Sequence, residues 1–461
     1  MKILLTHGYF LDEDEREKLI MKPYVPLGIL YVSAYLEKNG FANEIFDSTF
    51  SSFEKLKKKI SETQPDVIGI YTNLMTKLNV LKIIRHIRSE KTTEHIKIVL
   101  GGPEVRNHAK EFLQHGADVL VIGEGEETML QLVKKISSGE RISTVKGIAW
   151  LNESAVVFNE DQPLLKNIDE HPFPARKKIN LQMYFDAWKK AHGSSTISIS
   201  TMRGCPYTCK WCSRAVYGGT YRRRSAKLVV DEIIQLQSEY AFDNIWFVDD
   251  VFTISHKWLK EFAEEIEKRK IKIHYEIITR ADRMNEEVID LLVKSGCFRV
   301  WIGAESGSQE VIDAMDRRVE VKQVREMIKL ARKKGLEAGT FIMLGYPGET
   351  QKDIKETIRH LDESSPDHFT ITLAYPIKGT PLYAETENNF INPQRWEIST
   401  DRDIDFKRTY PRRYYDYALR YVHNEVAFRK NLKERTLLKL PVLKLKSLVA
   451  QSGMFFQRVI K

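Results

Sequence analysis

A short strand-like run that leads directly into a cluster of cysteines decides the fold of this chain. Residues 196–212 read TISISTMRGCPYTCKWC, with the spacing Cys-x3-Cys-x2-Cys at Cys205, Cys209 and Cys212. Three thiolates on one tight loop can hold three irons of a cubane cluster. The fourth iron then has no ligand from this motif and stays open to a chelating small molecule. The spacing therefore predicts a 4Fe-4S cluster with one open iron.

A structural zinc site is the alternative interpretation of the three cysteines. Structural zinc takes four closed protein ligands, so a fourth ligand would have to be found. His192 only precedes the motif, and Cys297 lies in an apolar context before a predicted strand, as a core cysteine does. Four cysteines in 461 residues are too few for a disulfide scaffold. Their clustering indicates a metal or redox site.

The cysteine motif opens a series of alternating strands and helices in residues 193–385. Six such units with no sign of a seventh predict an incomplete parallel barrel, a partial (β/α)6 fold. Barrel enzymes place their chemistry at the carboxyl ends of the strands. The strands are predicted at 196–200, 244–248, 274–278, 299–302, 338–344 and 368–372, and the helices near 225–240, 255–269, 285–295, 308–314, 321–334 and 351–363.

Residues 1–140 show a second alternating series, upstream of the barrel. It predicts an α/β domain of the doubly wound, Rossmann-like type, in which ligands bind beyond the carboxyl ends of the strands. Glycines at such ends let the backbone approach a ligand closely. The strands are predicted at 3–6, 44–47, 67–71, 96–100 and 119–122, the helices near 27–39, 52–62, 74–89, 105–115 and 127–137, and the strand ends of interest are Thr72-Asn73, Gly101-Gly102-Pro103 and Gly123-Glu124-Gly125-Glu126. Residues 141–192 read as a linker that contains a β-hairpin.

The last residues, 386–461, form a separate, basic helical region. Residues 407–461 carry 14 Lys and Arg against 3 Asp and Glu, a net of +11, which leaves −2 for the rest of a chain whose formal net charge is +9. Such a tail suits an anionic surface. Its interleaved residues are mostly Leu and Val, whereas single-strand nucleic-acid readers prefer aromatics, so no nucleic-acid partner is expected.

An apolar stripe runs along this tail. It comprises Val442, Leu445, Val449, Phe456 and Val459, at helical spacing and with basic residues between them. A stripe of this kind predicts either peripheral membrane contact, with a substrate that is then lipid-like, or a helix docked on the barrel or on a second subunit. Pro441 limits the predicted helix to the residues after it.

The chain contains no run of about 20 apolar residues, the length that spans a bilayer. The apolar start breaks after four residues and runs into Asp12, Glu13, Asp14 and Glu15, unlike a secretory signal. We therefore expect a cytoplasmic protein, with membrane association through the tail.

The cysteine motif after the first strand of a parallel barrel resembles the radical S-adenosylmethionine (SAM) superfamily. By that resemblance Trp211 packs near the adenine, Asp249 lies near the methionyl amino group, and Arg280 pairs with the SAM carboxylate. Glu305, in Gly303-Ala304-Glu305-Ser306-Gly307, corresponds to a ribose-contact segment, and residues 345–350 match a further recurring loop. These segments stand in order at successive predicted strand ends.

The N-terminal half resembles the cobalamin-binding domain of cobalamin-dependent radical SAM enzymes. The resemblance rests on residues 26–36, Gly101-Gly102-Pro103 and residues 123–128, and it covers about residues 1–385 together with the barrel. It implies cobalamin as a cofactor, held by loops that contain Leu27, Gly28, Thr72, Asn73, Gly101, Gly102, Gly123, Glu124, Gly125 and Glu126.

Cobalamin domains that bind cobalt through histidine carry Asp-x-His-x-x-Gly after the first strand. The corresponding residues here are Thr6-His7-Gly8-Tyr9-Phe10, which do not match. His108 and His115 lie outside the motif and are interpreted as ordinary surface histidines. We therefore expect cobalt without a histidine ligand, as is common in the radical SAM subgroup.

The resemblance implies methylation of an unactivated carbon, in which a 5′-deoxyadenosyl radical activates a small-molecule substrate and methylcobalamin delivers the methyl group. An electron donor such as flavodoxin or ferredoxin would reduce the cluster. The same cofactors also serve cyclases, hydroxylases and rearrangement enzymes, and the motifs do not separate these activities. A methylthiotransferase is rejected because residues 1–204 contain no cysteine for a second cluster. A cobalamin-responsive sensor would not need a cluster with an open iron.

Overall fold

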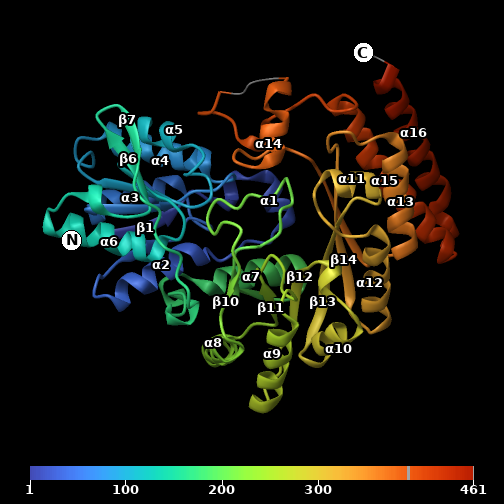
Figure 1. Cartoon of the computed structure of the whole chain (residues 1–461), viewed down its shortest axis with the longest axis horizontal. Helices are drawn as coiled ribbons and strands as arrows, with labels where there is room; N and C mark the ends of the chain where they lie inside the picture. The colour runs from blue at the N-terminus through green and yellow to red at the C-terminus, as the bar shows by residue number, and fades with distance from the viewer. Residues whose placement is uncertain (392–394, 460–461) are drawn as a thin grey trace.

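The two alternating series of the sequence form two parallel sheets that lie next to one another in the computed structural model, which describes residues 1–391 and 395–459 (Figure 1). The first sheet has the strand order β2-β1-β3-β4-β5-β6-β7. Its first five strands in the chain are parallel, and the order reverses direction at β1 and β3, as in a doubly wound fold. The strands are β1 (Ile3–His7), β2 (Glu44–Phe46), β3 (Val67–Tyr71), β4 (Lys97–Gly101), β5 (Val119–Val121), β6 (Ile148–Asn152) and β7 (Ala155–Phe158).

The side chains of the first sheet alternate between two apolar cores. Ile68 and Leu100 pack into the core that includes α3, α4 and α5, whereas Val67 and Val99 pack with α2 and α6. Period-two alternation along buried parallel strands places one helical layer on each face. The helices are α1 (Glu15–Ile20), α2 (Leu27–Lys38), α3 (Phe53–Thr63), α4 (Lys77–Ser89), α5 (Ala109–Gln114) and α6 (Gly125–Ser138).

The β6–β7 hairpin, which falls in the predicted linker 141–192, pairs with β5 in antiparallel fashion and ends the first sheet. Helix α7 (Leu181–His192) then leads into the second sheet. The domain bounds at residues 140, 192 and 385 stay predictions.

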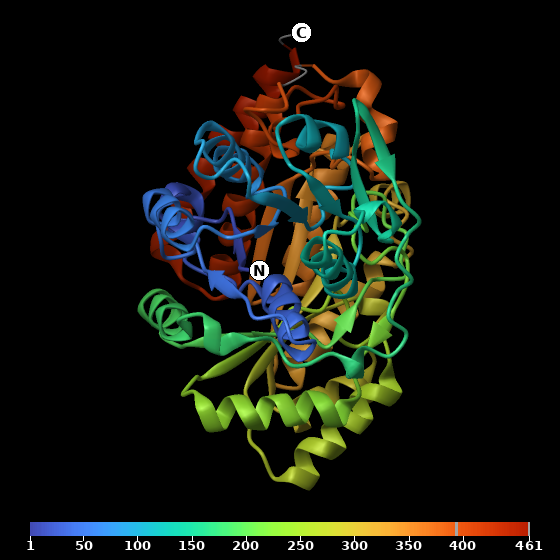
Figure 2. The ribbon, with the colours of Figure 1, turned by 90° about the vertical axis from the view of Figure 1, so that its left-hand side faces the viewer.

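The second sheet is the predicted partial barrel. Its six strands are all parallel and follow the chain order β8, β11, β12, β13, β14, β15, with helices on the outside (Figures 1 and 2). The elements are β8 (Thr196–Ile199), α8 (Ala226–Glu239), β11 (Asn244–Phe247), α9 (His256–Arg269), β12 (Tyr275–Thr279), α10 (Glu286–Lys294), β13 (Cys297–Glu305), α11 (Gln309–Ala314), α12 (Val321–Lys333), β14 (Glu337–Leu344), α13 (Gln351–Ser364) and β15 (His368–Leu373).

The C-terminal region is helical: its last two helices cover the outer side of the barrel at the right-hand edge of Figure 1, and its first helix lies at the top of that view. It consists of α14 (Pro381–Thr386), α15 (Arg412–Lys433) and α16 (Leu440–Val459). Pro441 sits in the first turn of α16, where its missing N–H costs no hydrogen bond, so the helix begins at Leu440, two residues earlier than predicted. Every helix in the described part of the chain is too short or too polar to cross a bilayer.

Helix α16 docks on α15 through small and buried residues. Ser447, Ala450 and Met454 are buried, and a side chain at Gly453 would collide with the ring of Tyr417. The Ser447 hydroxyl donates to the buried Glu425 carboxylate at 2.7 Å. The predicted stripe of Val442, Leu445, Val449, Phe456 and Val459 lies on the opposite face and is 55–64% exposed. The helix is therefore docked, but not through the stripe that the sequence analysis singled out.

Candidate functional site

The cysteine loop leaves the barrel through a short two-stranded ribbon. Strand β9 (Met202–Arg203) pairs in antiparallel fashion with β10 (Arg222–Arg223), which closes the loop between them. Gly204 has φ +81°, and a Cβ atom there would collide with the backbone oxygen of Thr220. Only glycine tolerates both the conformation and the close approach. The local sequence therefore forces the chain to turn immediately before Cys205.

All three cysteines line one cavity of about 480 Å³, the cysteine cavity, beyond the ends of the barrel strands. Among the described residues, no three His, Cys, Asp or Glu side chains converge closely enough to hold a single metal ion. A cubane cluster needs no such convergence, because each cysteine binds its own iron. We propose Cys205, Cys209 and Cys212 as the cluster ligands. Cys297 is buried in β13 and lies outside this cavity.

Two buried arginines surround Cys209. A guanidinium N–H of Arg280 and one of Arg317 each lie 3.7 Å from its sulfur. Arg280 also donates to Asp282 at 2.8 Å and to the backbone oxygen of Arg317 at 2.8 Å. The donors of Arg280 face the cysteine loop and these partners. The side chain therefore has a structural role as well as the proposed pairing with the SAM carboxylate.

Glu305 ends β13 in an unusual backbone conformation. Its φ is +62°, and the pairing register of β13 with β14 shifts between Gly303 and Glu305. A left-handed non-glycine residue and a bulge both cost energy and occur preferentially at functional sites. Burial raises the pKa of Glu305, although Arg317, 3.5 Å away, opposes the shift. Trp211 lines the same cavity, and its ring lies 5.6 Å from the Arg317 guanidinium.

Asp249 and Asp250, at the end of β11, occupy different environments. Asp249 is buried and accepts hydrogen bonds from the backbone N–H groups of Thr201 and Met202 at 2.7 and 3.2 Å, with Arg223 at 3.3 Å. It therefore anchors the chain that enters the cysteine loop. Asp250 lines the cysteine cavity, which Asp249 does not. We propose Asp250 as the carboxylate of this pair that faces the cofactor.

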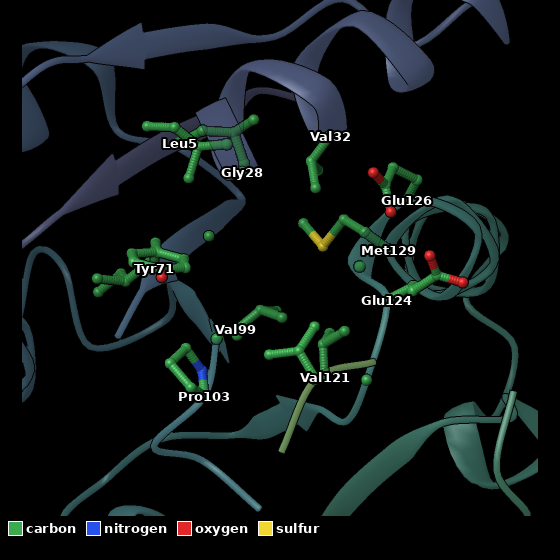
Figure 3. Close-up of a pocket in the computed structure, with 18 of the residues that line it drawn as sticks. Leu5, Gly28, Val32, Tyr71, Val99, Pro103, Val121, Glu124, Glu126 and Met129 are labelled. Atoms are coloured by element: carbon green, nitrogen blue, oxygen red, sulfur yellow. The ribbon is translucent and has the colours of Figure 1, made fainter. Parts of the chain in front are cut away.

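A second cavity of about 280 Å³, the corrin cavity, opens at the carboxyl ends of β1, β3, β4 and β5 (Figure 3). Apolar side chains surround it, and Tyr71 and Pro103 lie across it from Glu124 and Glu126. The predicted Gly28, Gly101, Gly102, Gly123, Gly125, Glu124 and Glu126 all line it. The other three predicted positions, Leu27, Thr72 and Asn73, support the site or lie beside it.

Glycines keep the corrin cavity open. Gly102 has φ +109°, and a Cβ atom there would collide with the backbone oxygen of Thr72. A Cβ atom at Gly69, on the cavity floor, would lie 2.7 Å from the Leu5 side chain. Thr72 itself does not line the cavity. Its backbone N–H donates to the Gly101 oxygen at 2.7 Å and so holds the Gly101-Gly102 loop in place from outside the cavity. The cradle of bare backbone and apolar walls fits a flat, apolar part of a cofactor.

Leu27 and Asn73 lie next to the corrin cavity instead of in its wall, and both line a neighbouring cavity of about 450 Å³. The Asn73 side-chain oxygen accepts from the N–H groups of Met75 and Thr76 at 3.0 Å, which caps the turn before α4. A cofactor role for these two residues and for Thr72 stays a prediction.

The histidines of the N-terminal unit need one correction. His108 is not a surface residue: it is 4% exposed, packed near Trp396 and the carboxylates of Glu104 and Asp401. Sequence could not show this, because residues 396 and 401 cover it from the far end of the chain. His7 is hydrogen-bonded to Asp47 at 3.0 Å. Neither histidine, nor the half-buried His115, belongs to the wall of the corrin cavity.

Ion pairs connect the two cavities. Arg203, two residues before Cys205, lies 2.8 Å from the Glu124 carboxylate and 2.5 Å from that of Glu126. Arg222 on β10 pairs with Glu124 at 2.7 Å. The base of the cysteine loop is therefore fixed to the glycine-rich loop of the first sheet. The sequence analysis did not single out Arg203 or Arg317, because nothing in their local pattern distinguishes them from ordinary charged residues, and in the segment Asp249-Asp250-Val251-Phe252 it chose Asp249.

The comparisons with known proteins match both halves of this geometry. The radical SAM superfamily model matches residues 199–361, and the B12 binding domain model matches residues 21–133. The chain carries a radical SAM domain and a B12 binding domain. Its cofactors are accordingly a 4Fe-4S cluster, SAM and cobalamin, and the cysteine and corrin cavities have the residues to receive them.

Curated relatives of this radical SAM protein include both methyltransferases and cyclases. It is 29% identical to an uncharacterised methyltransferase of Pyrococcus horikoshii over 418 residues, 87% of each chain. It is 27% identical to the anaerobic magnesium-protoporphyrin IX monomethyl ester cyclase of Cereibacter sphaeroides, over 85% of this chain and 66% of the relative.

A solved structure confirms the fold of the radical SAM protein. The radical SAM methyltransferase TsrM of Kitasatospora setae, with tryptophan and a SAM analogue bound, superimposes with a TM-score of 0.71 at 19% identity. The match covers 84% of this chain and 76% of TsrM.

Proposed function

We propose that this enzyme transfers a methyl group to an unactivated carbon of a small-molecule substrate. The observation that carries the proposal is the contact between the two cofactor cavities. Pro103, Val216 and Tyr217 line both the corrin cavity and the cysteine cavity. A methyl donor and a hydrogen-abstracting group have to reach one carbon, and a shared wall brings their sites into reach of it. When bound, the reduced cluster with SAM supplies radical chemistry and cobalamin supplies the methyl group.

The chain's own residues position these groups. Arg280 and Arg317 place two positive charges beside Cys209, where they would complement the negative charge of an iron-bound sulfur. The pairs of Arg203 with Glu124 and Glu126 hold the cysteine loop against the corrin cavity, so the relative placement of the two sites is rigid. Charged pairs that are buried in this way are costly to break.

Cyclisation, hydroxylation or rearrangement with the same cofactors is the second candidate, supported by the similarity to the Cereibacter sphaeroides cyclase. The product mass separates the two candidates. The holoenzyme is incubated anaerobically with a metabolite extract from a deletion strain and SAM that carries a deuterated methyl group. Methylation adds one deuterated methyl group to a metabolite that accumulates in the deletion strain. A product without the label would refute methylation.

The cluster needs a one-electron donor, and we propose a flavodoxin or ferredoxin as this partner. Dithionite serves as the matched control reductant. The protein donor should support SAM cleavage at a rate that saturates with its concentration, and cleavage that occurs only with dithionite would contradict the proposal.

We further propose that the outer face of α16 contacts an anionic membrane. Of the 20 large apolar side chains exposed in the described residues, 10 lie in residues 432–459, and Leu438 is 96% exposed. Lys439, Lys444, Lys446 and Arg458 flank them. Each basic residue near an anionic leaflet adds about 1 kcal/mol. A second copy fits this face less well, because two tails of net charge +11 would repel one another.

The membrane proposal is tested by co-sedimentation with phosphatidylglycerol-containing vesicles and with phosphatidylcholine vesicles. The triple variant Leu438→Ser, Leu445→Ser, Phe456→Ser and a chain truncated after Arg435 should lose binding to the anionic vesicles. The control replaces the exposed Leu19, Met183 and Val293, which lie on other surfaces, with Ser. Equal sedimentation of all forms with the anionic vesicles would contradict membrane contact and leave α16 with its docking on α15 alone.

A further inference from the structure

A segment from the end of the chain crosses onto the first unit. Residues 396–403, called the C-terminal strap, place the Trp396 ring against Phe112 in the apolar core of that unit, with the ring centroids 4.9 Å apart. The ammonium of Lys77, a buried residue of α4, donates to the Trp396 backbone oxygen at 2.9 Å. The strap therefore joins the region that follows the barrel to the unit that receives cobalamin.

His108 lies at the centre of this contact, with carboxylates on both sides of its ring. Its Nε2 lies 3.7 Å from the Glu104 carboxylate and 3.9 Å from that of Asp401 in the strap. Its Nδ1 lies 4.0 Å from the Glu111 carboxylate of α5. The side chains of His108, Glu104 and Asp401 are at most 7% exposed, so their charges are screened little. Only the imidazolium form presents an N–H and positive charge at both nitrogens.

The charged groups around His108 do not balance without it. Those that face the ring or its neighbours are three carboxylates and two ammonium groups: Glu104, Glu111, Asp401, Lys77 and Lys378. One negative charge is therefore in excess while the imidazole is neutral, and protonation of the ring cancels it. Farther from the ring lie Asp403, which acts on Lys77, Arg402, which acts on Glu17, and the side chains of Tyr383 and His115.

Glu104 and His108 belong to the β4–α5 loop, residues 102–108, which connects this charge cluster to the cofactor sites. The turn Gly102-Pro103 directly precedes Glu104 and lines the corrin cavity, and Pro103 lines the cysteine cavity as well. A displacement of the strap would therefore move the loop that forms part of both cavity walls.

We propose that His108 is a positioning residue for cobalamin: in its charged form it holds the C-terminal strap on the β4–α5 loop, which keeps the Gly102-Pro103 turn in place. Loss of the proton leaves buried negative charge without a partner, and such a charge is strongly destabilising. Because a histidine changes its charge between about pH 5 and pH 8, the strap contact and the affinity for cobalamin should both weaken as the pH rises through this range. This role in cofactor binding does not depend on methyl transfer.

The affinity for methylcobalamin tests this role. The cobalamin-free full chain, with its cluster reconstituted, is examined anaerobically and in the dark by equilibrium dialysis at about pH 6 and about pH 8. The wild-type protein should bind methylcobalamin about tenfold more weakly at the higher pH, because the buried carboxylates then lose their partner.

Three variants locate the titrating group. His108→Gln has no charge at either pH and should bind methylcobalamin as weakly at the lower pH as the wild type does at the higher pH. His108→Lys keeps its positive charge at both and should restore tight binding at the higher pH. The control, His86→Gln, removes a half-buried histidine of α4 that packs near Phe53, and it should keep the wild-type profile.

Cleavage by chymotrypsin measures the position of the strap in the same proteins. Cleavage after Trp396 requires the indole ring to leave the core of the first unit, whereas Leu438 is 96% exposed and serves as the internal reference. The ratio of the two cleavages cancels the effect of pH on the protease. This ratio should rise with pH in the wild type, be high at both pH values in His108→Gln and stay low in His108→Lys.

A wild-type affinity that does not change with pH, or a His108→Gln variant that keeps the wild-type profile, would overturn the proposed role. A loss of affinity with an unchanged cleavage ratio would show that the strap is not involved. Iron content shows whether each variant is folded, and if His108→Lys loses its cluster, the comparison of His108→Gln with His86→Gln decides. Both measurements are made without substrate, so a failure of the proposed methyl transfer would leave their outcome unchanged.

Discussion

The corrin and cysteine cavities lie side by side but are built by opposite means. The corrin cavity is shaped by side chains that are absent: Gly69 and Gly102 let the Leu5 side chain and the Thr72 backbone approach more closely than a Cβ atom would permit. The cysteine cavity is shaped by charge, with Arg280 and Arg317 directed at Cys209 and with the Glu305 side chain, 12% exposed, 3.5 Å from Arg317. A large planar cofactor needs space and apolar contact, whereas an iron cluster and a zwitterionic sulfonium compound need charge complementarity.

The largest expected effect comes from the cysteines themselves. Replacing Cys205, Cys209 and Cys212 with Ala should abolish iron binding and SAM cleavage, while cobalamin binding persists because its site has no cysteine. Iron content and the visible spectrum after anaerobic reconstitution measure this. Cys297→Ala, whose thiol donates to the Arg299 backbone oxygen at 3.4 Å, is the control. Loss of the cluster in that variant would contradict the ligand assignment.

Gly102→Ala should have the converse effect and abolish cobalamin binding while the cluster is kept. The new methyl group collides with the Thr72 backbone oxygen, so the loop has to move into or away from the corrin cavity. Gly40→Ala provides the control: its φ of +84° imposes a similar backbone strain of about 1 kcal/mol, but no atom lies within 4 Å of its Cβ position. Bound cobalamin is quantified from its absorbance. Equal loss of bound cobalamin in the Gly102→Ala and Gly40→Ala variants would mean that backbone strain, and not the collision with Thr72, causes the loss.

Arg317→Met should slow SAM cleavage by about tenfold, because one of the two charge-assisted hydrogen bonds to Cys209 is lost. The reduction potential of the cluster should fall as well, since a positive charge beside it favours the reduced form. Arg318→Met is matched in sequence but removes a 70% exposed side chain paired with Asp316. An unchanged potential in the Arg317 variant would remove its proposed electrostatic role.

The smallest expected effect is on the pH dependence of stability, and it concerns one buried carboxyl group in each unit, Glu126 and Glu349. Burial alone would raise the pKa of Glu126, but Arg203 holds it below the ordinary value. Glu349, fully buried near the end of β14, has no such partner, and burial raises its pKa from 4.5 to about 8. Between pH 4.5 and about 8, the folded state keeps a proton on Glu349 that the unfolded state has lost. The Glu349 contribution therefore weakens the fold as pH rises, by roughly 1.4 kcal/mol per pH unit.

Glu349→Gln should flatten the fall in stability between pH 5 and 8 and raise stability at the upper end, as measured by urea unfolding. Glu126→Gln should instead lower stability at neutral pH, because Arg203 loses a buried partner. Glu363→Gln, at a 43% exposed carboxylate, serves as the control. If the Glu349 variant kept the wild-type pH profile, the carboxyl would be ionised in the folded protein.

The fold and much of the lining of the two cavities could be predicted because they depend on local patterns. Strand runs, helix periodicity, glycine at strand ends and the cysteine spacing are each written in a few consecutive residues. The six parallel barrel strands and the first five strands of the N-terminal sheet follow the predicted segments with shifts at their ends. The side chains that complete the site, such as Arg203 and Arg317, have ordinary local contexts and acquire their role from distant partners.

The sequence by itself determined the two α/β units, the cluster loop and the glycine cradle, because backbone conformation and ligand spacing are short-range properties. Only the tertiary structure decided that Asp250 and not Asp249 faces the cysteine cavity, that His108 is buried, and that the stripe of α16 points outward. It also showed that Glu17 and Trp246, 229 residues apart in the sequence, bound one cavity. Burial and charge pairing join residues from remote segments, and no local pattern records which of them will meet.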